Sequence, residues 1–166
     1  MGKALGLLLI FCGFVLTGWG KASSLEQRAR NLALWQEFLC QFRICLETTR
    51  AAPREIVRML EKQNAFTELS GLETMTSAFG ESGSFAHAAE VLAKAAKRPG
   101  AVERVLLSLG DTVGIKPLEE QLSALQTGAS LLAREAQKAR EESRRYGGLC
   151  RRMGVLLGLL AVVVLA

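Results

Sequence analysis

The sequence predicts an all-α protein, an antiparallel helical bundle flanked by an N-terminal and a C-terminal membrane helix. Both ends of the chain are apolar, since no charge lies between Ala4 and Gly20 and none follows Arg152. Between them, apolar residues recur at spacings of three and four, as on one face of a helix. Glycine and proline divide this middle part into pieces of helix length.

Residues 1–20 are predicted to form the first membrane helix. The uncharged run is 17 residues long, about 25 Å as a helix, against roughly 30 Å of bilayer hydrocarbon. Lys3 and Lys21 flank it and Trp19 suits an interface. Because more basic residues follow the run than precede it, the positive-inside rule keeps the downstream part in the cytoplasm.

The alternative for the same segment is a cleaved secretory signal, since Lys3, the apolar run and small residues up to Ala22 imitate that layout. The chain would then be a secreted or surface helical protein with a C-terminal hydrophobic anchor. Lys21, Arg28 and Arg30 argue against this alternative, because they outweigh Lys3 in charge.

Residues 153–166 are predicted to form the second membrane helix. They are apolar but only 14 in number, about 21 Å as a helix, which is closer to a re-entrant or partially inserted segment. Four arginines between residues 144 and 152 precede them. This charge placement again assigns the middle of the chain to the cytoplasm, with both termini outside.

Residues 21–152 are predicted to form one compact cytoplasmic domain. Its first long helix is capped by Ser23 or Ser24 and ends in a turn near residues 48–52, because the residue before Pro53 disfavours helical angles. Its apolar face consists of Leu25, Ala29, Leu32, Trp35, Leu39, Phe42 and Leu46. The segments expected next are a short helix from Pro53, a weaker one over Phe66–Phe79, a loop over Gly80–Ser84, helices over Phe85–Lys97 and Ala101–Leu109, and a loop over Leu109–Pro117.

The last element before the second apolar run carries the longest helical pattern. Its stripe consists of Leu118, Leu122, Leu125, Ala129, Leu132, Ala136, Ala139, Ser143 and Tyr146. We expect this stripe to pack against the Leu25–Leu46 helix, which gives an antiparallel bundle. A homo-oligomeric coiled coil is the competing use, although the alanine-rich second half would make a weak zipper.

Composition and motifs indicate an interaction protein and not an enzyme. Net charge is +5 and acidic residues interleave with basic ones, so no nucleic acid is expected. The four cysteines have no C-x-x-C spacing and the single histidine, His87, has no nucleophile motif beside it. No phosphate-binding glycine loop is present. We therefore expect no catalytic residue, metal, cofactor or small-molecule substrate.

The most unusual local feature is the loop that carries Gly110 and Gly114, followed by Gln121 on the long helix. The loop could be a docking site. It could also be only a tight connection between helices, in which glycine supplies a positive φ at a helix C-terminus. From the residues alone, both interpretations stay open.

These residues resemble the stage III sporulation protein AB family. Its loop pattern, L-G-x-x-L-G-x-x-D-x-x-x-Q, matches Leu109-Gly110, Gly114 and Gln121, with Val113 in place of the second leucine and Pro117 in place of the aspartate. Its C-terminal pattern, L-G-x-L-x-G-L, is similar to the stretch from Met153 to Leu159, which contains Gly154 and Gly158 as a membrane-proximal motif.

The resemblance implies a subunit of a channel-like assembly between mother cell and forespore. It implies a location on the mother-cell side of the outer forespore membrane, in contact with lipid and with other subunits of the assembly. The cytoplasmic bundle is then expected to be similar to the domain of type II secretion and type IV pilus platform proteins. The expected partner is a secretion-type ATPase like stage III sporulation protein AA.

Overall fold

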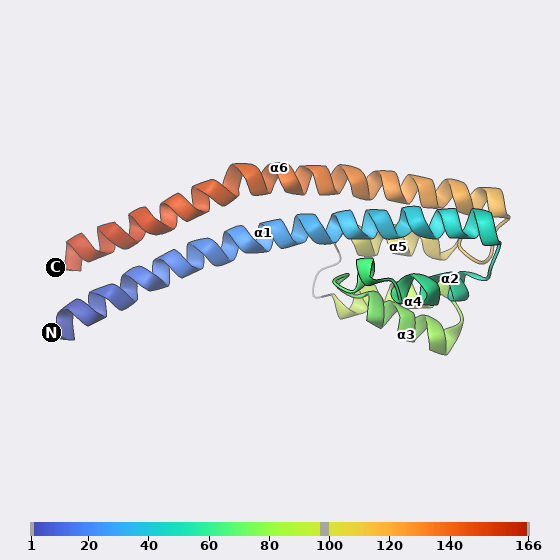
Figure 1. Cartoon of the computed structure of the whole chain (residues 1–166), viewed down its shortest axis with the longest axis horizontal. Coiled ribbons are helices and arrows are strands. Elements are labelled where there is room, and N and C mark those ends of the chain that lie inside the picture. The colour runs from blue at the N-terminus through green and yellow to red at the C-terminus, as the bar shows by residue number, and fades with distance from the viewer. Residues whose placement is uncertain (1, 97–99, 166) are drawn as a thin grey trace. The chain divides into compact units, whose positions relative to one another are not determined.

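A computed structural model describes residues 2–96 and 100–165, although the surroundings of several side chains in the two apolar runs are not described. Figure 1 shows that the described residues form helices joined by short connections. The elements are α1 (Gly2–Thr49), α2 (Pro53–Glu61), the 3-10 helix η1 (Asn64–Phe66), α3 (Leu72–Ser82), α4 (Phe85–Ala95), α5 (Ala101–Gly110) and α6 (Leu118–Leu165). The prediction of an all-α bundle is confirmed.

The chain divides into two compact units, residues 1–30 with 137–166 and residues 31–136. In the first unit, Ala22 is buried, and a Cβ built on Gly147 would lie 4.0 Å from the Ala22 Cβ, so α1 and α6 approach closely there. The membrane boundaries predicted after residues 20 and 152 both fall inside these continuous helices. They remain predictions from the sequence.

The core of the second unit is built on aromatic side chains. Trp35 contacts Phe38 edge to face, with ring centroids 5.5 Å apart, and Phe38 contacts Phe66 in the same way at 5.6 Å. Phe42 reaches Phe85 at 6.2 Å. These contacts attach α1 to η1 and α4, and such pairs add stability beyond the apolar area they bury.

The two predicted apolar stripes are largely confirmed. On α1, the positions from Ala29 to Leu46 are buried and Leu25 is half-buried. On α6, the stripe positions from Leu125 to Ala139 are buried, Leu118, Leu122 and Ser143 are half-buried, and Tyr146 is 55% exposed. Within residues 31–136 the facing segments of α1 and α6 are antiparallel, because Arg43 contacts Gln126 while the earlier Leu39 lies beside the later Gly128.

Two predicted boundaries are wrong. Ser23 and Ser24 do not cap a helix, since they lie inside α1, where the Ser24 hydroxyl donates to the Lys21 carbonyl. This helix continues through them because nothing in the backbone there requires a break. The predicted loop over Gly80–Ser84 is also too long, because α3 continues to Ser82 and ends at Gly83, whose φ is 67°.

The weaker helix predicted over Phe66–Phe79 begins only at Leu72, because a glycine with a positive φ precedes it. Gly71 has a φ of 89°, a left-handed conformation that separates the turn after η1 from the first residue of α3. The start of the Pro53 helix and the buried side formed by Ile56, Val57 and Leu60 are as predicted. The helix predicted over Phe85–Lys97 ends at Ala95, and residues 97–99 lie outside the described residues.

Among the residues that the structure describes, no helix has the length and apolar character that crossing a membrane requires.

Candidate functional site

The loop between α5 and α6 is anchored to the core before it reaches the surface. The N–H groups of Thr112 and Val113 both donate to the carbonyl of Leu109, at 3.0 and 2.9 Å. The Val113 side chain is buried. These bonds close one last tight turn after α5, so the segment that follows starts from a fixed position.

Gln121, on the first turns of α6, reaches back and binds this segment at two points. Its side-chain oxygen accepts the backbone N–H of Gly114 at 3.1 Å, and its side-chain nitrogen donates to the carbonyl of Lys116 at 2.6 Å. Because an amide offers both an acceptor and donors, glutamine can make this pair of bonds with one side chain. We call the arrangement the Gln121 clamp, formed by Gly114, Lys116 and Gln121.

Gly110 and Gly114, the two glycines of the loop motif, are required for different structural reasons. Gly114 has a φ of 83°, in the left-handed region, and a Cβ there would meet only the Pro53 side chain, at 3.7 Å. Gly110 is buried at the end of α5, and a Cβ built on it would lie 3.0 Å from the Cα of Ala86. Of the two glycines, Gly114 therefore supplies the positive φ expected in this connection, whereas Gly110 permits close packing against α4.

The clamped segment presents one apolar side chain to solvent. Ile115 is 69% exposed and lies between the two backbone groups that Gln121 binds. Thr112, whose carbonyl accepts the Ile115 N–H, also lines an open hollow of about 440 Å³ together with Glu119, Glu120, Ser123 and Ala124. Sequence reasoning missed Ile115 as a candidate, although an isoleucine between glycine and lysine in a predicted loop is an available signal.

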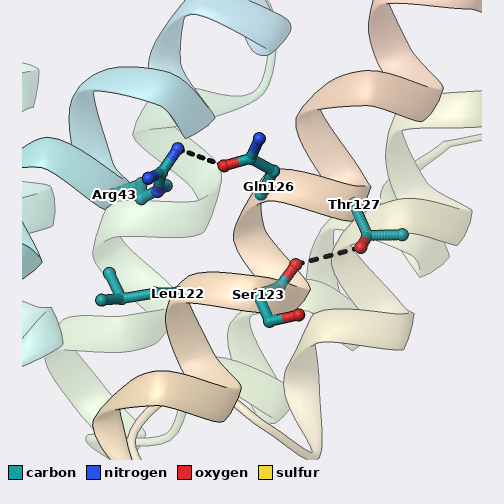
Figure 2. Close-up of a pocket in the computed structure, with 5 residues that line it drawn as sticks. All are labelled: Arg43, Leu122, Ser123, Gln126 and Thr127. Atoms are coloured by element: carbon teal, nitrogen blue, oxygen red, sulfur yellow. Dashed lines mark hydrogen bonds between the residues drawn. The ribbon is translucent and has the colours of Figure 1, made fainter.

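A second hollow lies where α1 and α6 face each other around Arg43 (Figure 2). Its volume is about 280 Å³, and Leu122, Ser123, Gln126 and Thr127 complete its lining. The Arg43 guanidinium donates to the Gln126 side-chain oxygen, and its Nε is buried without a hydrogen-bond partner. This hollow holds polar groups but no nucleophile with an adjacent base.

The other residues considered from the sequence lie apart from the loop. His87 is exposed in the first turn of α4, where its backbone N–H contacts the Ser84 hydroxyl. Gly154 and Gly158 lie within α6, in a stretch where their surroundings fall outside the described side chains. In the part of the chain that the structure describes, no three His, Cys, Asp or Glu residues converge as metal ligands would. The structure brings Gly114 and Gln121 into direct contact, whereas Gly110 packs against α4.

The fold and the clamped loop define a class of protein, an all-α bundle whose motif residues shape one interhelical surface loop. The chain belongs to the stage III sporulation protein AB family, whose sequence model matches residues 3–166. The resemblance to this family is thereby confirmed over nearly the whole chain. This is a family of sporulation proteins and not a known family of enzymes. No curated protein and no solved structure matches the chain.

Proposed function

We propose that the chain is a membrane-anchored docking subunit of a sporulation channel-like assembly between mother cell and forespore. Residues 21–152 are its cytoplasmic domain, and they present the α5–α6 loop to a secretion-type ATPase like stage III sporulation protein AA. The observation that carries the proposal is the Gln121 clamp, in which Gly114 and Gln121 hold the loop's exposed segment in one conformation. Preorganised loops bind at a lower entropic cost than flexible ones.

The two apolar ends support the membrane part of the proposal. Several large apolar side chains of residues 1–30 and 137–166 are open to the surroundings, including Leu16 at 69%, Trp19 at 60% and Leu156 at 64%. In water such exposure is unfavourable over many neighbouring residues. Bilayer lipid would cover them, with residues 1–20 and 153–166 as the two anchors and Gly154 and Gly158 in the second.

Binding of the full chain to the ATPase tests the docking role. The chain is reconstituted in nanodiscs, and binding of the purified stage III sporulation protein AA from the same bacterium is measured by interferometry. Saturable binding with a Kd on the order of micromolar or tighter is expected. Absence of binding, with empty nanodiscs as the control, would refute the assignment of the partner.

Cysteine accessibility in intact sporulating cells tests the orientation. The native cysteines are replaced by alanine and a single cysteine is introduced at Ser82, which is exposed at the end of α3. The proposal predicts that a membrane-impermeant maleimide labels Ser82→Cys only after the cells are opened. Labelling of intact cells would contradict a cytoplasmic domain and favour the secreted alternative.

A further inference from the structure

Ile115 is the most exposed large apolar side chain described in residues 31–136. Its 69% exposure exceeds that of Ile44, Leu131 and Met59, at 54%, 45% and 44%. Those three lie on helices, whereas Ile115 lies in the loop after α5. A single exposed apolar residue is ordinary on a protein surface, so exposure alone assigns no role.

What distinguishes Ile115 is that its backbone is fixed on both sides. Gln121 binds the N–H of the residue before it and the carbonyl of the residue after it. In addition, the N–H of Ile115 donates to the Thr112 carbonyl at 3.3 Å. The side chain therefore cannot fold back into the core without breaking these bonds, and the loop holds an apolar group in water.

From Asp111 to Glu120 the exposed charged side chains are three carboxylates and one amine, that of Lys116, so this surface has a net acidic charge. Thr112, whose carbonyl accepts the Ile115 N–H, also lines the hollow of about 440 Å³ together with Glu119 and Glu120. Both glutamates are exposed on the first turn of α6. An apolar projection on a surface of net acidic charge is complementary to an apolar pocket that is edged by basic side chains.

We propose that Ile115 is the anchor through which this loop docks a protein partner, whose surface offers an apolar pocket bordered by lysine or arginine. The inference rests on the proposed docking function and specifies the chemistry of its partner. The apolar side chain enters the pocket, and the basic groups meet Glu119 and Glu120 over the hollow. An anionic membrane surface or a nucleic acid does not fit, because both repel carboxylates.

Photocrosslinking in sporulating cells tests this directly with the full chain. Benzoylphenylalanine is placed at position 115, and at position 44 as the matched control, because Ile44 is also an exposed isoleucine but lies on α1. Crosslinked peptides are identified by mass spectrometry. The result expected is an adduct from position 115, and not from position 44, to an apolar segment of another protein that contains lysine or arginine.

Charge reversal tests the acidic part of the inference. Glu119→Lys with Glu120→Lys is expected to lower the crosslink from position 115 at least about fivefold. The control pair Glu73→Lys with Glu81→Lys, two exposed glutamates of α3, should leave it unchanged. Equal amounts of each variant in the membrane fraction show that folding and insertion are intact.

The outcomes separate this inference from the proposed partner. An adduct to the ATPase supports both. An adduct to a different protein with the stated chemistry supports docking through Ile115 and refutes the ATPase as the partner. The inference would be overturned if no adduct formed, or if the adduct were to lipid, to a second copy of the chain or to a segment without basic residues. Equal yields from both positions, or no effect of the charge reversal, would also overturn it.

Discussion

The backbone N–H of Gly114 donates to the side-chain oxygen of Gln121 at 3.1 Å, across seven residues of sequence. The same amide donates from its nitrogen to Lys116, so one side chain connects α6 with the loop that precedes it. This relationship gives two letters of the family motif a shared physical purpose. Glycine permits the left-handed turn and glutamine holds it in place.

Replacement of Gln121 should loosen the loop. Gln121→Ala removes both bonds and is expected to lower the free energy of unfolding by about 1–2 kcal/mol. Gln121→Glu should lose a similar amount, because its carboxylate keeps the acceptor but faces the Lys116 carbonyl without a donor. Urea unfolding of the full chain in detergent, followed by circular dichroism, measures both. Gln137→Ala, an exposed glutamine of α6, is the control, and equal losses in all three variants would contradict the clamp.

Substitution of Gly114 should cost stability through its φ and not through crowding. Gly114→Ala is expected to destabilise by about 1–2 kcal/mol, because an L-residue is strained at a φ of 83°. Gly114→Asn should cost less, since asparagine tolerates that region better. Gly148→Ala, at an open helical position, should instead stabilise by up to about 1 kcal/mol. Thermal melting compares the three variants, and identical losses for alanine and asparagine would count against the strain explanation.

Substitution of Gly110 should cost stability through packing. A methyl group there would lie 3.0 Å from the Ala86 Cα, a backbone atom that cannot move without shifting α4. We expect Gly110→Ala to destabilise by about 1–3 kcal/mol. At Gly128 the nearest atoms are side-chain carbons of Val105 and Leu109 and not backbone atoms, so Gly128→Ala should cost less. Denaturant midpoints measure the order of the two, and the reverse order would refute this packing account.

The end of α1 offers a stabilising change. Arg50 has a φ of 50°, and its N–H donates to the Leu46 carbonyl at 3.1 Å, a helix end at which glycine is favoured. Arg50→Gly is expected to raise the free energy of unfolding by about 1 kcal/mol. Arg58→Gly, inside α2, should lower it by a similar amount. A rise in melting temperature for Arg50→Gly is the checking measurement, and a fall would show that the arginine side chain matters more than its φ.

Much of the fold could be predicted because long helices repeat their apolar residues over many turns. The faces of α1 and α6 follow directly from that repetition, as does their antiparallel packing. The continuity of α1 through Ser24 could not be predicted, since a local cap signal is outweighed by the surrounding helix. The start of α3 could not be predicted either, because it depends on the left-handed φ of Gly71. The motif identified Gly114 and Gln121 but not their contact, because the turn that joins them depends on three-dimensional geometry.

The degree of exposure of Ile115 and the packing role of Gly110 could not be predicted, for a related reason. Exposure of one loop side chain depends on how the backbone around it is held, and proximity to Ala86 depends on how α4 packs against α5. Neither depends on residue type at a regular spacing. Both are properties of contacts between segments that lie apart in the chain.

The most direct test of the account is the affinity of the full chain for stage III sporulation protein AA, with and without the clamp. We predict that Gln121→Ala weakens binding at least about tenfold, equivalent to about 1.4 kcal/mol, while the protein still accumulates in the membrane. Gln137→Ala should bind as the unchanged chain does. If Gln121→Ala bound with unchanged affinity, the loop would be only a connector between α5 and α6, and its docking role would be contradicted.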